Sequence, residues 1–270
     1  MRAAMERVAA AGSFVAAHCE VEALIPAGGC CHDGAFARAQ GFPGIPSESE
    51  YAEIARDIRL AAETGCRLHI CHLSTKEGAA LVRKARKRGL PVTCEVTPHH
   101  LFLTEDNIGD DYSTALKVNP PLRTAADAEA LIAGVIDGTV DAIVTDHAPH
   151  TAWEKDREFE LAPFGMIGLE TSLGLVITNL VATGKISWER MTELMGANQR
   201  AILGVERVAL EAGSTADLTV IDPEAAWTVD AADFCSKAKN SGFIGAQLTG
   251  RATDVYVGGY ATMEDGKIVE

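Results

Sequence analysis

Apolar and polar positions follow two alternating patterns along the first part of the chain. Four short apolar runs, each typical of a buried strand, lie at 14–18, 66–72, 90–96 and 139–146. Longer segments with helical spacing predict helices at 47–64, 74–89, 124–138, 168–183 and 187–199. Strands that are apolar on both faces and separated by helices indicate parallel β/α packing with right-handed crossovers.

Two Ser-x-x-Glu sequences predict where two of these helices begin. Ser47 with Glu50, and Ser74 with Glu77, have the spacing of capping boxes. In a capping box the serine accepts a bond from the third amide of the helix, and the glutamate reaches back to the cap. We therefore predict that Glu50 closes the first turn of a helix that ends before Gly65.

The pattern changes near the C-terminus. Segments 216–223, 225–230 and 253–270 alternate apolar and polar residues with turn residues between them, which is typical of antiparallel strands. We expect 1–205 to form part of a barrel and 206–270 to form a partial β-sandwich appendage. The fold class is then α/β, a partial TIM-type (β/α)₈ barrel, because only four barrel-type strands are evident and a closed barrel needs eight.

Composition excludes several classes of function. The 270 residues include 38 acidic and 24 basic side chains, a net charge of −14, which argues against binding to nucleic acid or to an anionic membrane. The seven cysteines are an odd number and suit a reducing cytoplasm. No apolar run approaches the ~18 residues of a transmembrane helix, and the N-terminal segment does not resemble a signal peptide.

Three side chains that bind metals in proteins end three of the predicted strands. His18 ends the first strand, His72 ends the second and Asp146 ends the fourth. The C-terminal strand ends of a β/α barrel form its active-site face, so the three should converge. Two imidazoles and a carboxylate are a common catalytic zinc set. Asp146 could also take a proton from a water that attacks a carbonyl.

Other histidines have simpler interpretations. His150 could bind an anionic substrate group or order its own loop, and the sequence leaves both open. His69 alternates with Leu68 and Ile70, so we expect it to pack under a helix on the other face. His147 is expected to orient its neighbour Asp146.

Eight stretches of the sequence resemble bacterial dihydroorotases of the amidohydrolase superfamily. In family order they are AAHCE (16–20), GIPSESE (44–50), LHICHLSTKEG (68–78), VTCEVTPHHLFLT (92–104), KVNPPLR (117–123), IVTDHAPH (143–150), APFGMIGLET (162–171) and AGSTADLTVIDP (212–223). The resemblance implies a metal-dependent hydrolase barrel with two Zn²⁺ ions per site. His18 and His72 match the histidines that bind the more buried zinc. Asp146 matches an aspartate that binds the other zinc and acts as general base and acid.

The resemblance also implies residues that hold the substrate. Asn119 matches a residue that contacts the dihydropyrimidine ring, and His150 one near the substrate carboxylate. Phe164 and Gly165 match a loop segment that lines the substrate.

The implied reaction is the reversible cyclisation of N-carbamoyl-L-aspartate to L-dihydroorotate in pyrimidine biosynthesis. One alternative is a hydantoinase-like cyclic amidohydrolase. Another is a non-catalytic partner of aspartate carbamoyltransferase. We expect a small-molecule substrate and a homo-oligomer.

The chain departs from the family pattern in one major respect. The family's opening strand, with His-x-His followed by Arg, has no counterpart here, and neither does the carboxylated Lys or Asp near the metals. The chain therefore looks like the C-terminal two-thirds of a dihydroorotase, and we expect it to be inactive by itself.

Overall fold

A parallel four-stranded sheet forms the centre of the first part of the molecule. The computed structural model describes residues 1–269. The sheet order is β1-β4-β5-β6, with strands β1 (Phe14–Ala17), β4 (Arg67–Ile70), β5 (Val92–Val96) and β6 (Ala142–Ile143). The four predicted strands are thus confirmed in their predicted order, although β6 is shorter than expected. All three pairings are parallel, so all four strands end at the same edge.

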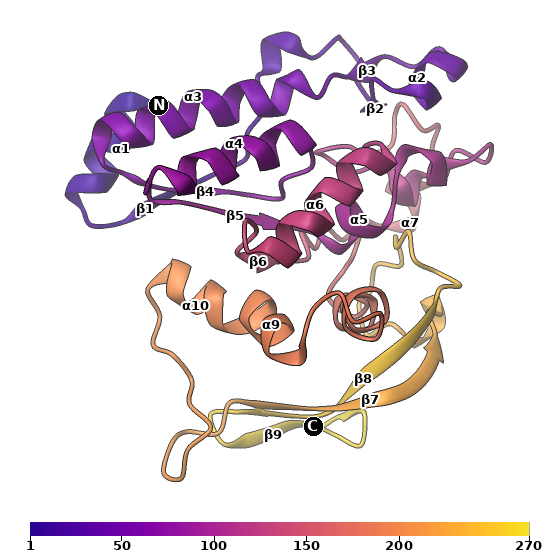
Figure 1. Cartoon of the computed structure of the whole chain (residues 1–270). Helices are drawn as coiled ribbons and strands as arrows, with labels where there is room; N and C mark the ends of the chain where they lie inside the picture. The colour runs from indigo at the N-terminus through magenta and orange to yellow at the C-terminus, as the bar shows by residue number, and fades with distance from the viewer. Residues whose placement is uncertain (270) are drawn as a thin grey trace. The chain divides into compact units, whose positions relative to one another are not determined.

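Helices cover one face of this sheet. Figure 1 shows α3 (Glu48–Thr64) and α4 (Lys76–Lys87) lying along the same side of β4 and β5. The buried positions of α4 include Ala79, Val82 and Ala85, spaced by three residues, so one stripe of the helix packs inward. Leu68 and Ile70 of β4 are also buried. The remaining long helices of this part are α1 (Arg2–Ala10) and α6 (Ala125–Asp137).

Short elements fill the connections after each strand. They are η1 (Glu22–Leu24), β2 (Cys31–His32), α2 (Ala35–Gln40), β3 (Gly44–Ile45), α5 (Pro98–Phe102), η2 (Glu105–Ile108), η3 (Thr114–Leu116) and α7 (Ala152–Lys155). β2 and β3 form a separate parallel pair inside the Gly- and Pro-rich segment before α3. The connections at the carboxyl edge of the sheet therefore contain regular secondary structure.

The second part contains an antiparallel sheet with the order β10-β9-β8-β7. Its strands are β7 (Leu218–Thr228), β8 (Gln247–Val257), β9 (Tyr260–Glu264) and β10 (Lys267–Ile268), with η6 (Ala231–Asp233) between the first two. The predicted strands 216–223 and 225–230 are one strand, because a register shift between Asp222 and Ala226 accommodates Pro223. The helical segments are α8 (Ser172–Val176), η4 (Ile177–Val181), α9 (Trp188–Thr192), η5 (Glu193–Ala197) and α10 (Asn198–Leu203).

The contacts divide the chain into two compact units. Unit 1 comprises Met1–Gly168 with Cys235–Gly242, and unit 2 comprises Leu169–Phe234 with the residues from Phe243 on. Helices α8 to α10 thus group with the antiparallel sheet, whereas the expected division of the sequence lay between 205 and 206. The assignment of 1–205 to the barrel stays a prediction.

The two predicted capping boxes are wrong. Ser47 has helical backbone angles and makes no side-chain cap bond, and the Glu50 carboxylate is bonded to Ser74 and Thr75 and does not reach back to the cap. The cap of α4 is Thr75, whose hydroxyl accepts from the Gly78 amide. In both cases a contact between distant segments replaces the local one.

In the part of the chain that the structure describes, no helix is both long enough and apolar enough to span a membrane.

Candidate functional site

Three predicted site residues follow strands at the carboxyl edge of the parallel sheet. His18 comes directly after β1, His72 two residues after β4, and Asp146 three residues after β6. His72 has φ +32° and Asp146 has φ +46°. Such values are uncommon for residues other than glycine and concentrate at functional sites. Two of the three residues predicted from their positions at strand ends therefore have strained backbone conformations.

His18 and His72 are in direct contact. His18 Nδ1 lies 3.0 Å from His72 Nε2, and the ring centroids are 4.7 Å apart at an interplanar angle of 71°. Burial lowers the pKa of His72, and the neighbouring His18 lowers it further, whereas Asp146 raises it. Because His72 favours its neutral form, one of its ring nitrogens keeps the lone pair that a metal ligand needs.

The imidazole pair fits metal binding. Two nitrogens at ~2.0–2.1 Å from a tetrahedral zinc would be about 3.4 Å apart, close to the 3.0 Å observed. His72 Nδ1 is buried without a hydrogen-bond partner, whereas His72 Nε2 is the nitrogen that contacts His18. Asp146 is exposed. Among residues 1–269, no group of three or more His, Cys, Asp or Glu side chains is arranged to hold a metal ion. The described residues supply two candidate ligands, His18 and His72, and the carboxylate of Asp146.

A second cluster brings His150 and Phe164 together. His150 Nε2 lies 2.9 Å from the Phe164 carbonyl oxygen, and Lys117 Nζ lies 4.7 Å from the centroid of the Phe164 ring. Gly165 has φ +130°, and a Cβ there would meet Ala148 Cβ at 2.6 Å. Only glycine suits this position. The structure thus shows His150 contacting the 164–165 segment through Nε2, while its Nδ1 lies 3.6 Å from Glu154 Oε2.

Asn240 holds this cluster and has no signal in the sequence. Its Nδ2 donates to the carbonyl oxygens of Ala148 at 3.0 Å and Gly165 at 3.1 Å. Its Oδ1 accepts from the His150 amide at 3.2 Å. The contacts join residues 75 to 92 positions apart in the chain, and no local pattern could have indicated them.

Asn119 presents a buried acceptor. Its Oδ1 has no hydrogen-bond partner within the described part of the chain. Such an atom is costly unless a ligand or water meets it. The segment around Asn119 is fixed on both sides, because the Gly165 amide donates to the Lys117 carbonyl at 2.8 Å and Pro120 O lies 2.9 Å from His100 Nε2.

His99, in α5, is a further buried polar group. Its Nε2 is buried without a partner in the described residues. Burial lowers the pKa of His99 to about 3, and the charge of His72 contributes. His99 therefore lies in the electrostatic range of the His18–His72 pair and remains neutral near pH 7.

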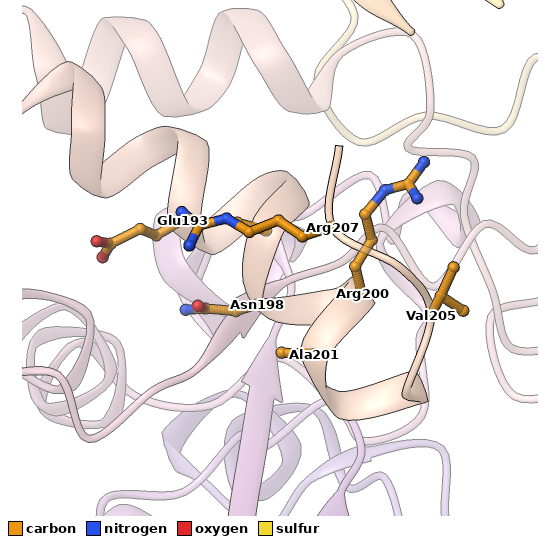
Figure 2. A pocket seen from close by; sticks show the side chains of 7 residues that line it. Glu193, Asn198, Arg200, Ala201, Val205 and Arg207 are labelled. Carbon is orange, nitrogen blue, oxygen red and sulfur yellow. The ribbon is translucent and has the colours of Figure 1, made fainter. Parts of the chain in front are cut away.

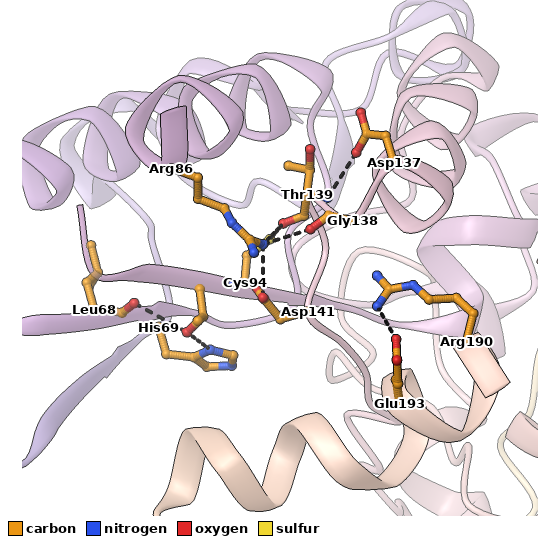
Figure 3. A network of polar contacts seen from close by, with 11 residues as sticks. Leu68, His69, Arg86, Cys94, Asp137, Gly138, Thr139, Asp141, Arg190 and Glu193 are labelled. Atoms are coloured by element: carbon orange, nitrogen blue, oxygen red, sulfur yellow. Dashed lines mark hydrogen bonds and ion pairs between the residues drawn. The ribbon is translucent and has the colours of Figure 1, made fainter. Parts of the chain in front are cut away.

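The expectation that His69 packs under a helix is wrong. Its Nδ1 lies 2.8 Å from Thr93 Oγ1 and its Nε2 lies 2.9 Å from Glu95 Oε2, both on the neighbouring strand β5. Figure 3 shows the His69 ring on the side of the sheet opposite to α4 and Arg86. The register pairs His69 with Thr93, so alternation places a polar row on the face away from these helices.

An open hollow in unit 2 lies elsewhere and carries none of these residues. Its volume is about 250 Å³, and its polar lining consists of Glu193, Asn198, Arg200 and Arg207, which Figure 2 shows on η5, on α10 and on the loop after it. All the candidate site residues predicted from the sequence lie in unit 1.

Known proteins resemble this chain over its whole length. A family model described as Dihydro-orotase-like matches residues 1–78. A dihydroorotase from Brevibacillus brevis is 46% identical over 269 residues, which are 100% of this chain and 62% of that protein. The dihydroorotase of Bacillus subtilis is 44% identical over 270 residues, which are 100% of this chain and 63% of that protein.

Solved structures of hydantoinases superpose on this chain. The L-hydantoinase from Arthrobacter aurescens superposes with a TM-score of 0.89 at 31% identity, over 98% of this chain and 60% of that one. A D-hydantoinase from Thermus sp. has the same TM-score at 24% identity, over 99% of this chain and 60% of that one, and it supports the fold alone.

The parallel sheet forms a partial barrel of the amidohydrolase fold, and the antiparallel sheet forms a C-terminal appendage. Within that fold the sequence is similar to dihydroorotases over its whole length. The chain spans about 62% of the length of the relatives that it matches.

Proposed function

We propose that this chain carries part of a dihydroorotase active site, which interconverts N-carbamoyl-L-aspartate and L-dihydroorotate. The observation that carries the proposal is the His18–His72 pair at 3.0 Å, in a chain 44–47% identical to dihydroorotases. The pair follows strands β1 and β4 at the edge where β/α barrels bind their substrates.

In this proposal His18 and His72 would hold one of two Zn²⁺ ions. Zinc would act as a Lewis acid on the ring carbonyl. Asp146 takes the proton of the water that attacks this carbonyl. When the C–N bond of the ring breaks, Asp146 returns the proton to the leaving amide nitrogen. Ring closure follows the same steps in reverse.

The second cluster is proposed to hold the substrate. Asn119 Oδ1, a buried acceptor without a partner, would accept a ring N–H. His150 in its imidazolium form would donate from Nδ1 to the substrate carboxylate in place of Glu154, while its Nε2 donates to the Phe164 carbonyl. Phe164 and Gly165 would line the pocket. A carboxylate contact of this kind separates a dihydroorotase from a hydantoinase, whose substrate ring lacks that group.

Two alternatives have an observation in their favour. A hydantoinase-like activity is supported by the solved structures that superpose on this chain. A non-catalytic partner of aspartate carbamoyltransferase is supported because residues 1–269 contain no complete group of three metal ligands. We also propose that the protein works in the cytoplasm, on the basis of its seven cysteines outside disulfides, and that it forms a homo-oligomer.

The decisive experiment supplies the part of the relatives that this chain does not span. The chain is fused behind the corresponding N-terminal segment of the Bacillus subtilis dihydroorotase, and the chimaera is purified from a host without its own dihydroorotase gene. We expect zinc-dependent turnover of dihydroorotate, followed by ultraviolet absorbance, and no turnover by the 270-residue chain alone. A folded, zinc-loaded chimaera that opens hydantoins and leaves dihydroorotate intact would favour the hydantoinase alternative. Turnover by the chain alone would reject the expectation of inactivity.

A further inference from the structure

The first turn of helix α3 contacts both histidine-bearing segments. The Val21 amide, three residues after His18, donates to the Ser49 carbonyl at 2.8 Å. The next residue, Glu50, binds the segment that follows His72. One helical turn is thus attached to the chain on both sides of the imidazole pair.

The hydrogen bonds of the Glu50 carboxylate are made with the segment that follows His72. Its side chain is 3% exposed. It accepts from the Ser74 amide at 3.2 Å, the Ser74 hydroxyl, the Thr75 amide at 3.0 Å and the Thr75 hydroxyl at 2.6 Å. A carboxylate has about four lone-pair sites, and these four donors fill them. The bonds therefore fix the backbone two and three residues beyond His72.

Arg123 extends the network toward the proposed substrate segment. Its Nε donates to Ser74 Oγ at 3.1 Å, and its Nη1 donates to Ile45 O at 3.0 Å and lies 3.2 Å from His32 Nδ1. Burial lowers the pKa of Arg123, and the Glu50 carboxylate is the largest influence in the opposite direction. Arg123 lies four residues after Asn119, so Ser74 connects the His72 segment to the Asn119 segment.

The His72 segment needs such support. His72 has φ +32°, a conformation that persists only where the surroundings impose it. Glu50 supplies these contacts in place of the capping box that its sequence position predicts. Glu50 therefore does not cap α3, and its contacts are with the segment that carries His72.

We propose that Glu50 and Arg123 are positioning residues that keep the His72 imidazole at ligand distance from His18. The inference rests on the proposed metal pair and extends it to residues that touch neither metal nor substrate. Loss of the Glu50 contacts should let segment 72–75 relax, which separates the rings and weakens metal binding.

The key variant is Glu50→Gln, because its amide NH₂ would face the Ser74 and Thr75 amide donors. The matched control is Asp141→Asn. Asp141 Oδ2 accepts from the Cys94 amide at 2.9 Å and its Oδ1 binds Arg86 at 2.9 Å, just before β6 at the opposite edge of the sheet (Figure 3). Both substitutions place an amide against a backbone N–H, but only Glu50→Gln does so beside the histidines.

The first readout needs no metal. In the full chain with ¹⁵N-labelled histidine, the 3.0 Å contact between His18 and His72 should give a nitrogen–nitrogen coupling across the hydrogen bond. We expect this coupling in the unmodified chain and in Asp141→Asn, and its loss in Glu50→Gln. Glu50→Ala should also lose it, and either folded variant decides the test.

The second readout is the affinity for Co²⁺, followed by its visible absorption. We expect a decrease of about 10-fold or more in Glu50→Gln, the lower end of the effect of removing a group that supports a metal ligand, and no change in Asp141→Asn. Retention of both the coupling and the affinity in Glu50→Gln would overturn the inference. Equal losses in Asp141→Asn would show general destabilisation and overturn it too.

Absence of the coupling in the unmodified chain would reject the pair itself. An inactive chimaera whose Glu50→Gln variant loses the coupling would reject the proposed activity and keep the positioning role.

Discussion

The two edges of the parallel sheet use polar residues in opposite ways. At the amino edge, Arg86 Nη1 donates to Gly138 O, Thr139 O and Asp141 Oδ1 at 2.8–2.9 Å, and Asp141 also accepts from the Cys94 amide. At the carboxyl edge, His72 Nδ1, His99 Nε2 and Asn119 Oδ1 are buried without partners in the described part of the chain. Paired polar groups stabilise a fold, whereas unpaired ones are costly and indicate a site for ligands.

The backbone shows the same contrast. His72 and Asp146 have positive φ at the carboxyl edge, and an extensive network from Glu50 supports the first of them. Proteins keep strained residues where the surrounding structure compensates for them. The contrast between the two edges therefore places the candidate site at the carboxyl edge of the sheet. The described part of the chain has no complete group of three metal ligands there or elsewhere.

The largest expected effect is that of Asp146→Asn in the chimaera. The substitution keeps the shape of the side chain and removes its ability to take a proton. We expect kcat to fall at least ~10²-fold, the usual effect of a positioned acid–base group. Asp141→Asn, at the opposite edge, should turn over normally. Near-normal kcat in Asp146→Asn would show that another group moves the proton.

Alanine at Asn119 or His150 should weaken catalysis and leave the metal in place. A lost hydrogen bond to a polar or charged substrate group costs ~1.5–3 kcal/mol, which is about 10–100-fold in kcat/KM. Zinc content, measured by elemental analysis, should be unchanged in both variants. Loss of zinc from His150→Ala would mean that His150 binds metal and that its assignment to the substrate is mistaken.

The buried neutral histidine at the carboxyl edge should make stability depend on pH. The pKa of His99 is lowered to about 3 in the folded chain, against ~6.5 when unfolded. Because the unfolded state binds the extra proton, this stabilisation is present above pH ~6.5 and is lost progressively as the pH falls toward 3. His99→Phe should reduce the slope of unfolding free energy against pH by about 1.4 kcal/mol per pH unit between these values. Urea unfolding of the metal-free chain at several pH values measures this slope, and an identical slope would contradict the burial of a neutral His99.

The smallest expected effect is a difference in unfolding free energy between two helix N-cap positions, Thr124 and Ser47. Thr124 accepts from the Asp127 amide and forms a capping box, whereas Ser47 makes no cap bond. Thr124→Ala should cost about 1 kcal/mol of unfolding free energy and Ser47→Ala less than about 0.5 kcal/mol. Chemical denaturation compares the two, and equal costs would show that Ser47 caps its helix after all.

Much of the fold could be predicted from local patterns, and the exceptions have a common cause. The four parallel strands and the start of α6 at Thr124 follow from periodicity and capping chemistry. Strand-end placement also brings His18 and His72 together. The roles of Glu50, His69 and Asn240 could not be predicted, because their partners lie on segments 24 to 92 residues away.

The central claim is that the paired imidazoles at the carboxyl edge are zinc ligands. X-ray absorption of the zinc-loaded 270-residue chain tests it directly, because nitrogen ligands lie at ~2.0–2.1 Å and thiolates at ~2.3 Å. The account predicts imidazole scattering at the shorter distance that disappears in His72→Ala. Sulfur scattering from any of the seven free cysteines, or a spectrum unchanged by His72→Ala, would contradict it.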